Sequence, residues 1–163
     1  MDAFAASALG DIPDLPQLIR VVVRLLAAVI AGAVIGAQRE RHGKNAGLRT
    51  HILVALGCAV FVLGVSEHGY DNDAVSRVIQ GVVTGVGFLG AGTILKRTSA
   101  NTIKGLTTAG SIWVTAAIGI AAGLGQITVT LVAVVLTWIV LSILVRLEDR
   151  INPRKGDDEP AKD

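Results

Sequence analysis

LIRVVVRLLAAVIAGAVIGA, residues 18–37, is apolar over almost its whole length and contains no Asp or Glu. A helix needs about 20 predominantly apolar residues to cross the hydrocarbon core of a bilayer, so this stretch predicts a transmembrane helix. Four further stretches are similarly apolar and also lack Asp and Glu, at residues 51–65, 78–95, 105–123 and 126–145. We therefore expect an all-α membrane protein with five transmembrane helices.

Length and composition leave room for a single membrane domain. The chain has 163 residues, of which 52% are hydrophobic, and its mean hydropathy of +0.61 is typical of membrane proteins. The expected organisation is a short extracytoplasmic segment at 1–17, a five-helix domain at 18–146 and a charged, mobile cytoplasmic tail at 147–163. The first segment lacks the basic start of a signal peptide.

Charges in the connecting segments alternate along the chain. Residues 38–49 carry four basic side chains against one acid, and residues 96–104 carry three basic side chains and no acid. The intervening segment instead carries the acids Glu67, Asp71 and Asp73. Cytoplasmic loops of membrane proteins are enriched in Lys and Arg, which places the N-terminus outside and the C-terminus in the cytoplasm.

Small residues predict which helices pack closely, because helices in lipid associate where small side chains let their backbones approach. The first span has Ala28, Gly32 and Gly36 at four-residue spacing, and the fourth has Gly119 and Gly123. The last span contains no glycine, which favours a peripheral helix that faces lipid or a second subunit.

The run GVGFLGAG, residues 85–92, is unusually rich in glycine for a helix. Each glycine disfavours the helix by about 1 kcal/mol relative to alanine. We expect close packing of this span against the fourth, and at this run a kink, a broken helix or the close approach of a ligand.

Residue types that would indicate catalysis or metal binding are not grouped. The three histidines have no metal-ligand spacing, and no span contains the carboxylates that usually coordinate or relay cations at membrane depth. The sequence therefore predicts no enzyme, no cofactor, no metal site and no nucleic-acid partner.

Basic and hydroxyl side chains are expected at one depth, near the cytoplasmic ends of the spans. They form a candidate site for an anion, either a lipid head group or an acidic segment of a partner, and the alternative is ordinary positive-inside charge. This set comprises Arg39, Arg49, Thr50, Lys104, Thr107 and Thr108.

Three motifs in order resemble the MgtC/SapB family of bacterial inner-membrane proteins. They are AGLRTHILVALG (46–57), VIQGVVTGVGFLGAG (78–92) and IKGLTTAGSIWVTAAIG (103–119). The resemblance implies a multi-pass protein of the inner membrane, linked to growth in low magnesium and, in pathogens, to survival inside host cells. It further implies a regulator whose partners are membrane complexes such as the ATP synthase or a transporter.

Several motif positions carry over to this chain, and two depart from the family pattern. Gln38 stands where members often have an acid, and Thr107 stands where the namesake proteins carry Asn. The long C-terminal soluble domain of some members is also missing. The remaining motif positions outside the basic set are Arg77, Gln80, Gly85, Phe88, Gly90, Gly92, Gly105 and Trp113.

Two functions remain open at this point. The first is a non-enzymatic regulator that binds lipid and partner membrane proteins and adjusts ion or energy homeostasis. The alternative is a transporter or ion pathway that uses backbone carbonyls of the glycine-rich third span, which need no acidic side chain. Self-association is left open for both functions and would use the last span or the small-residue face of the first.

Overall fold

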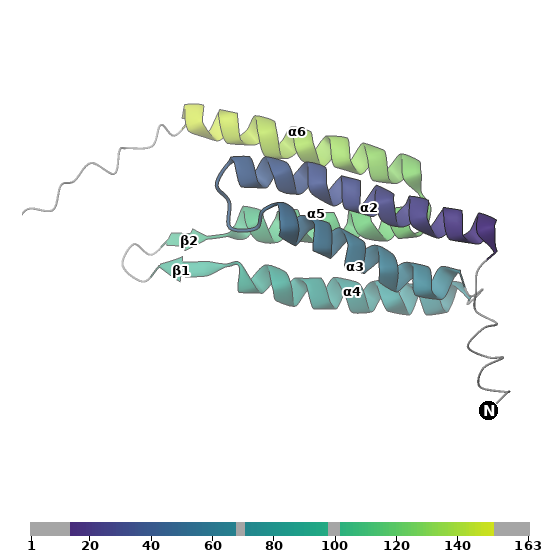
Figure 1. Cartoon of the computed structure of the whole chain (residues 1–163). Coiled ribbons are helices and arrows are strands. Elements are labelled where there is room, and N and C mark those ends of the chain that lie inside the picture. Colours follow the sequence, from purple (N-terminus) through teal and green to yellow (C-terminus); the bar gives the residue numbers. More distant parts are fainter. Residues whose placement is uncertain (1–13, 68–70, 98–101, 152–163) are drawn as a thin grey trace, which may run out of the picture.

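The computed structural model describes residues 14–67, 71–97 and 102–151 and is a bundle of five helices with one short hairpin (Figure 1). The all-α class is confirmed. The elements are α2 (Leu15–Arg41), α3 (Leu48–Ser66), α4 (Asn72–Gly92), β1 (Leu95–Arg97), β2 (Thr102–Lys104), α5 (Leu106–Gly123) and α6 (Ile127–Ile151).

Four of the helices, α2 to α5, are long and apolar enough to cross a membrane. In α6 the apolar stretch found among the described residues is Ile127–Ile143, and the sequence stays apolar through Leu144 and Val145 up to Arg146. The first helix begins at Leu15, inside the expected N-terminal segment, because Asp14 caps it by accepting a hydrogen bond from the Gln17 N–H at 2.9 Å. At the other end, α6 continues to Ile151.

Helix α5 is the centre of the bundle and contacts each of the other four helices. In Figure 1, α6 and α4 lie at opposite sides of the bundle, with α2, α3 and α5 between them. One group of buried side chains joins α3, α4 and α5, and another joins α2, α5 and α6 around Ile35, Ile118 and Leu141. The peripheral position expected for the last span agrees with this arrangement, since α6 packs against α2 and α5.

Helix α3 is held between the glycine faces of its two neighbours, as the small-residue pattern predicts. A Cβ atom added to Gly32 of α2 would lie 2.6 Å from the carbonyl oxygen of His51, and one added to Gly123 of α5 would lie 2.8 Å from that of Ala59. Gly119 faces the Ala55 backbone in the same way. These glycines allow the backbone contact that close helix packing in lipid requires.

The glycine-rich run does not break its helix: α4 is continuous from Asn72 to Gly92, so the expectation of a broken helix is wrong. The expected close packing of this span is also wrong for most of its glycines. A Cβ atom on Gly81, Gly85, Gly87 or Gly92 would meet no atom within 4 Å, and only Gly90 packs, against Ala109 of α5. The buried residues of α4 are Val86 and Gly90 alone, so most of this helix lies on the surface of the bundle.

The segment between α4 and α5 forms an antiparallel hairpin, in which Leu95 pairs with Lys104. Gly105 follows it with φ +99° and caps α5. An added Cβ would collide with the Thr93 carbonyl, so both the backbone angle and the contact require glycine here.

Candidate functional site

The most unusual side chain in the described parts of the chain is Arg39, near the end of α2. It is only 3% exposed, and its Nη2 donates a hydrogen bond to Thr108 Oγ1 of α5 at 2.6 Å. Thr108 is also buried, in the first turn of α5. Two members of the expected basic and hydroxyl set are thereby brought into contact across 69 residues of sequence.

A second buried polar side chain, His51 of α3, lies beside this pair and is fully buried. Its Nδ1 lies 2.9 Å from the Gly47 carbonyl, and its Nε2 lies 3.3 Å from Ser111 Oγ of α5. The Ser111 hydroxyl in turn donates to the Thr108 carbonyl at 2.8 Å. Arg39, Thr108, Ser111 and His51 therefore form one polar cluster where α2, α3 and α5 meet, which we call the buried cluster.

Arg39 has more hydrogen-bonding capacity than this cluster satisfies. Its Nε is buried and has no partner in the structure. The neighbouring acid, Glu40, accepts a hydrogen bond from the Leu48 N–H at 2.8 Å instead. Among the described residues the single ion pair is Arg24 with Glu67, so no carboxylate there balances the Arg39 charge. A buried cation without a counter-ion is costly for folding.

Gln38 joins α2 to α6. Its Nε2 donates to Ser142 Oγ at 2.5 Å and to the Trp138 carbonyl at 3.3 Å, while its buried Oε1 has no partner. The amide thus tethers the peripheral helix beside the buried cluster.

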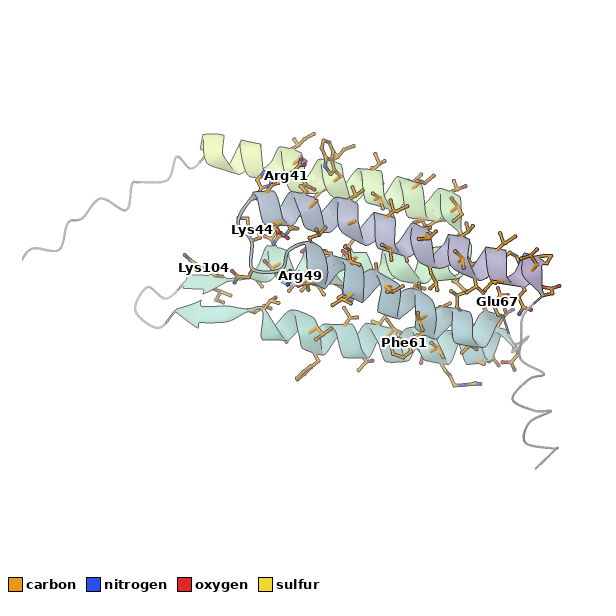
Figure 2. The ribbon with its side chains drawn as sticks, in the orientation of Figure 1. Arg41, Lys44, Arg49, Phe61, Glu67 and Lys104 are labelled. Atoms are coloured by element: carbon orange, nitrogen blue, oxygen red, sulfur yellow. The ribbon has the colours of Figure 1, made fainter. Side chains whose placement is uncertain are left out.

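The other members of the basic and hydroxyl set lie on the surface of the same end of the bundle. Arg49 and Thr50 are exposed in the first turn of α3, Lys104 is exposed at the end of β2, and Thr107 is exposed in the first turn of α5. Figure 2 shows Arg41, Lys44, Arg49 and Lys104 near this end and Glu67 at the opposite end. The set is therefore divided into a buried pair, Arg39 and Thr108, and an exposed basic surface.

The remaining motif positions are dispersed. Arg77 and Gln80 are exposed near the start of α4, far along that helix from the hairpin. Phe88 is 81% exposed and Trp113 is 52% exposed. Gly90 and Gly105 are packing glycines, whereas Gly85 and Gly92 line open grooves.

Arg24 lies at the opposite end of the bundle from the buried cluster. Its Nη1 binds Glu67 Oε1 at 2.6 Å and donates a hydrogen bond to the Gly123 carbonyl at 3.4 Å. This contact ties α2 to the end of α3 and to the turn before α6.

No group of three or more His, Cys, Asp or Glu side chains in the described ranges is arranged to hold a metal ion. Sequence reasoning missed the role of His51, because it considered histidines only as metal ligands. A usable signal existed: His51, Ala55 and Ala59 repeat every four residues on the face of α3 that meets the glycines of α2 and α5. The Gln38–Ser142 contact has no comparable signal, since it depends on how α6 packs.

Comparison with known proteins identifies relatives across most of the chain. The model of the MgtC family matches residues 25–150. The Escherichia coli (strain K12) protein named "Putative magnesium transporter YhiD" is 45% identical over 138 residues, which cover 80% of this chain and 63% of that protein. Protein SrpB of Synechococcus elongatus is 45% identical over 136 residues, 77% of this chain and 75% of SrpB.

Protein MgtC of Salmonella typhimurium (strain LT2) is 40% identical over 131 residues, which cover 80% of this chain and 55% of that protein. The match thus spans less than two thirds of YhiD and of MgtC. No solved structure has significant similarity to this chain.

Proposed function

Because this chain belongs to the MgtC family, we propose that it is a non-enzymatic membrane regulator of magnesium and energy homeostasis. It is a multi-pass membrane protein that acts by binding partner membrane proteins, with the ATP synthase or a transporter as candidate partners. Its place is the bacterial cytoplasmic membrane, with the basic surface around Arg49 and Lys104 facing the cytoplasm.

The burial of Arg39 carries this proposal. Arg39 is a cation buried where α2, α3 and α5 meet, and no described carboxylate pairs with it. In a medium of low dielectric constant, this charge repels Mg2+ at short range. Pathways for cations through membrane proteins are normally lined by acidic side chains or by free carbonyl groups. A bundle with a cationic interior is better suited to recognise a partner than to conduct Mg2+.

The alternative function, transport, is favoured by the name of the relative from Escherichia coli, "Putative magnesium transporter YhiD". Its expected route through a broken third span loses its basis, because α4 is a continuous helix whose interior carbonyls accept helical hydrogen bonds. Transport therefore has no identified pathway among the described residues.

Measurement of Mg2+ flux separates these two functions. We expect purified protein in liposomes loaded with a Mg2+-sensitive dye to give no influx above protein-free liposomes under an inward Mg2+ gradient. A known magnesium channel, reconstituted at the same protein-to-lipid ratio, is the positive control. A saturable influx that requires this protein would contradict the regulator and support the transporter.

The proposed orientation can be measured with single cysteines at the two ends of the bundle. In a Cys58→Ala background, Asn45→Cys at the basic end and Asn72→Cys at the start of α4 are both exposed positions. We expect a membrane-impermeant maleimide to label Asn72→Cys in intact spheroplasts and Asn45→Cys only after lysis. The reverse pattern, or labelling of both from outside, would overturn the orientation.

A further inference from the structure

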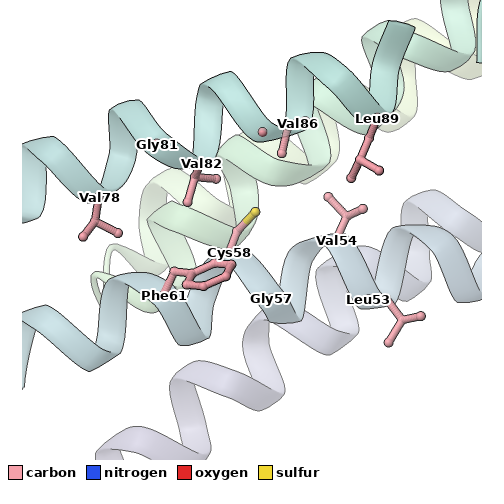
Figure 3. Close-up of a pocket in the computed structure, with 11 residues that line it drawn as sticks. Leu53, Val54, Gly57, Cys58, Phe61, Val78, Gly81, Val82, Val86 and Leu89 are labelled. Carbon is pink, nitrogen blue, oxygen red and sulfur yellow. The ribbon is translucent and has the colours of Figure 1, made fainter. Parts of the chain in front are cut away.

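An apolar groove with a volume of about 670 Å³ lies between α4 and α3. Its walls include Leu53, Val54 and Phe61 of α3 and Val78, Val82 and Leu89 of α4. In Figure 3, Phe61 and Val82 face each other across the groove, and Leu89 points toward Val54. Leu53 is 67% exposed and Phe61 is 64% exposed, so the groove is open to the surroundings of the bundle.

Three glycines, Gly57, Gly81 and Gly85, also line this groove. A Cβ atom on any of them would meet no atom within 4 Å, so contacts inside this chain do not require glycine there. Glycine is the poorest helix former after proline. The effect of these glycines is to keep the groove deep along the helix axis.

The groove continues into a smaller pocket at the basic end of the bundle, where three of the lining residues are polar. This pocket has a volume of about 280 Å³ and shares Val54 and Leu89 with the groove. Its polar lining comes from Asn45, Thr50 and Thr93. Arg49 precedes Thr50 in the first turn of α3, is exposed and forms no ion pair with another described residue.

We propose that the groove and the pocket together bind one anionic glycerophospholipid. An acyl chain lies in the groove between α3 and α4, and the phosphate lies at the pocket, where the Arg49 guanidinium makes a bidentate contact that lysine cannot reproduce. Charge complementarity and the arrangement of the two cavities favour this ligand. The apolar groove runs along α3 and α4, and the polar lining residues lie in the pocket at the end of the bundle that carries the basic surface. The inference goes beyond the regulator proposal and holds or fails independently of it.

Native mass spectrometry tests the proposal with lipids of known composition. The purified protein in mild detergent is mixed with equal amounts of phosphatidylglycerol and phosphatidylcholine that carry the same acyl chains. We expect retention of one phosphatidylglycerol, preferred by about tenfold, as a charge-assisted contact would produce. Equal retention of both lipids, or of neither, would overturn the proposal.

Matched variants test each part of the site. Gly85→Leu fills the groove, whereas Gly87→Leu lies on the same helix with equally open space but does not line the groove. We expect only Gly85→Leu to abolish lipid retention. Arg49→Gln should remove the preference for phosphatidylglycerol, and Arg41→Gln at the end of α2 should keep it.

Two outcomes would show that another occupant fills the groove. If wild-type protein is a dimer in the spectrometer and Gly85→Leu converts it to a monomer without a change in lipid retention, the groove binds a second copy. If Gly85→Leu and Gly87→Leu reduce retention equally, the lipid lies elsewhere on α4. Either result overturns the lipid site, and the folded state of each variant is checked by its elution volume and its helical circular dichroism.

Discussion

Replacement of Arg39 by methionine is expected to abolish function without destabilising the protein. Methionine has a similar length, so it fills the space between α2, α3 and α5 and removes a cation that is 3% exposed and lacks a described counter-ion. Removal of a buried charge is often neutral or stabilising for folding. If Arg39 recognises a partner or an anion, the Arg39→Met variant will be stable but inactive.

The measurement combines growth and stability. Growth in low-magnesium medium is followed in a strain whose own copy of the gene is deleted, with membrane levels verified by immunoblot. The unfolding midpoint is read from Trp113 and Trp138 fluorescence in detergent. We expect Arg39→Met to abolish growth rescue and to keep or raise the midpoint, while the exposed Arg41→Met at the end of the same helix behaves as wild type.

Thr108→Val separates the charge from its hydrogen bond. This variant retains the Arg39 charge but removes the acceptor at 2.6 Å, which leaves a buried donor unsatisfied at a cost of about 1–3 kcal/mol. We expect a lower unfolding midpoint than that of Arg39→Met. Full growth rescue by Arg39→Met would show that the buried charge serves the fold alone and would remove the main support for the proposed regulator.

The fold was largely predictable from the sequence because membrane helices are encoded locally. Five apolar stretches without Asp or Glu, the first at 18–37, predicted the positions of all five helices. Most of the predicted helix ends lie within a few residues of the observed ones. Close packing at Gly32 and Gly119 was predictable for the same reason: spacing by four residues puts small side chains on one face of a helix. These inferences need no knowledge of which helices are neighbours.

The glycines of α4 show where this reasoning fails. Gly81 and Gly85 follow the same four-residue spacing as Gly119 and Gly123, yet the first pair faces open space and the second faces α3. Spacing reveals that one face of a helix carries small side chains, but it does not reveal whether another helix of the chain covers that face. The buried cluster was missed in part for the same reason, since the Arg39–Thr108 and His51–Ser111 contacts join helices far apart in sequence.

The largest effect on folding is expected for Gly119→Leu in the central helix. A Cβ at this position would overlap the carbonyl oxygen and Cα of Ala55 in α3. Because the obstacle is backbone rather than the end of a flexible side chain, a change of rotamer cannot relieve the contact. Overpacking typically costs about 1–3 kcal/mol and occasionally more, and we expect about 3 kcal/mol or more here.

Gly110→Leu provides the matched control for Gly119→Leu on the same helix. A Cβ on Gly110 would meet nothing within 4 Å, and leucine is a better helix former than glycine, so this variant should be at least as stable as wild type. Stability is compared by equilibrium unfolding in mixed detergent micelles, together with the amount of each protein in the membrane. Similar stability of the two variants would mean that α5 and α3 can move apart without a loss of folding stability. The close contact at Ala55 would then not hold the bundle together, and the placement of the buried cluster between these helices would need another cause.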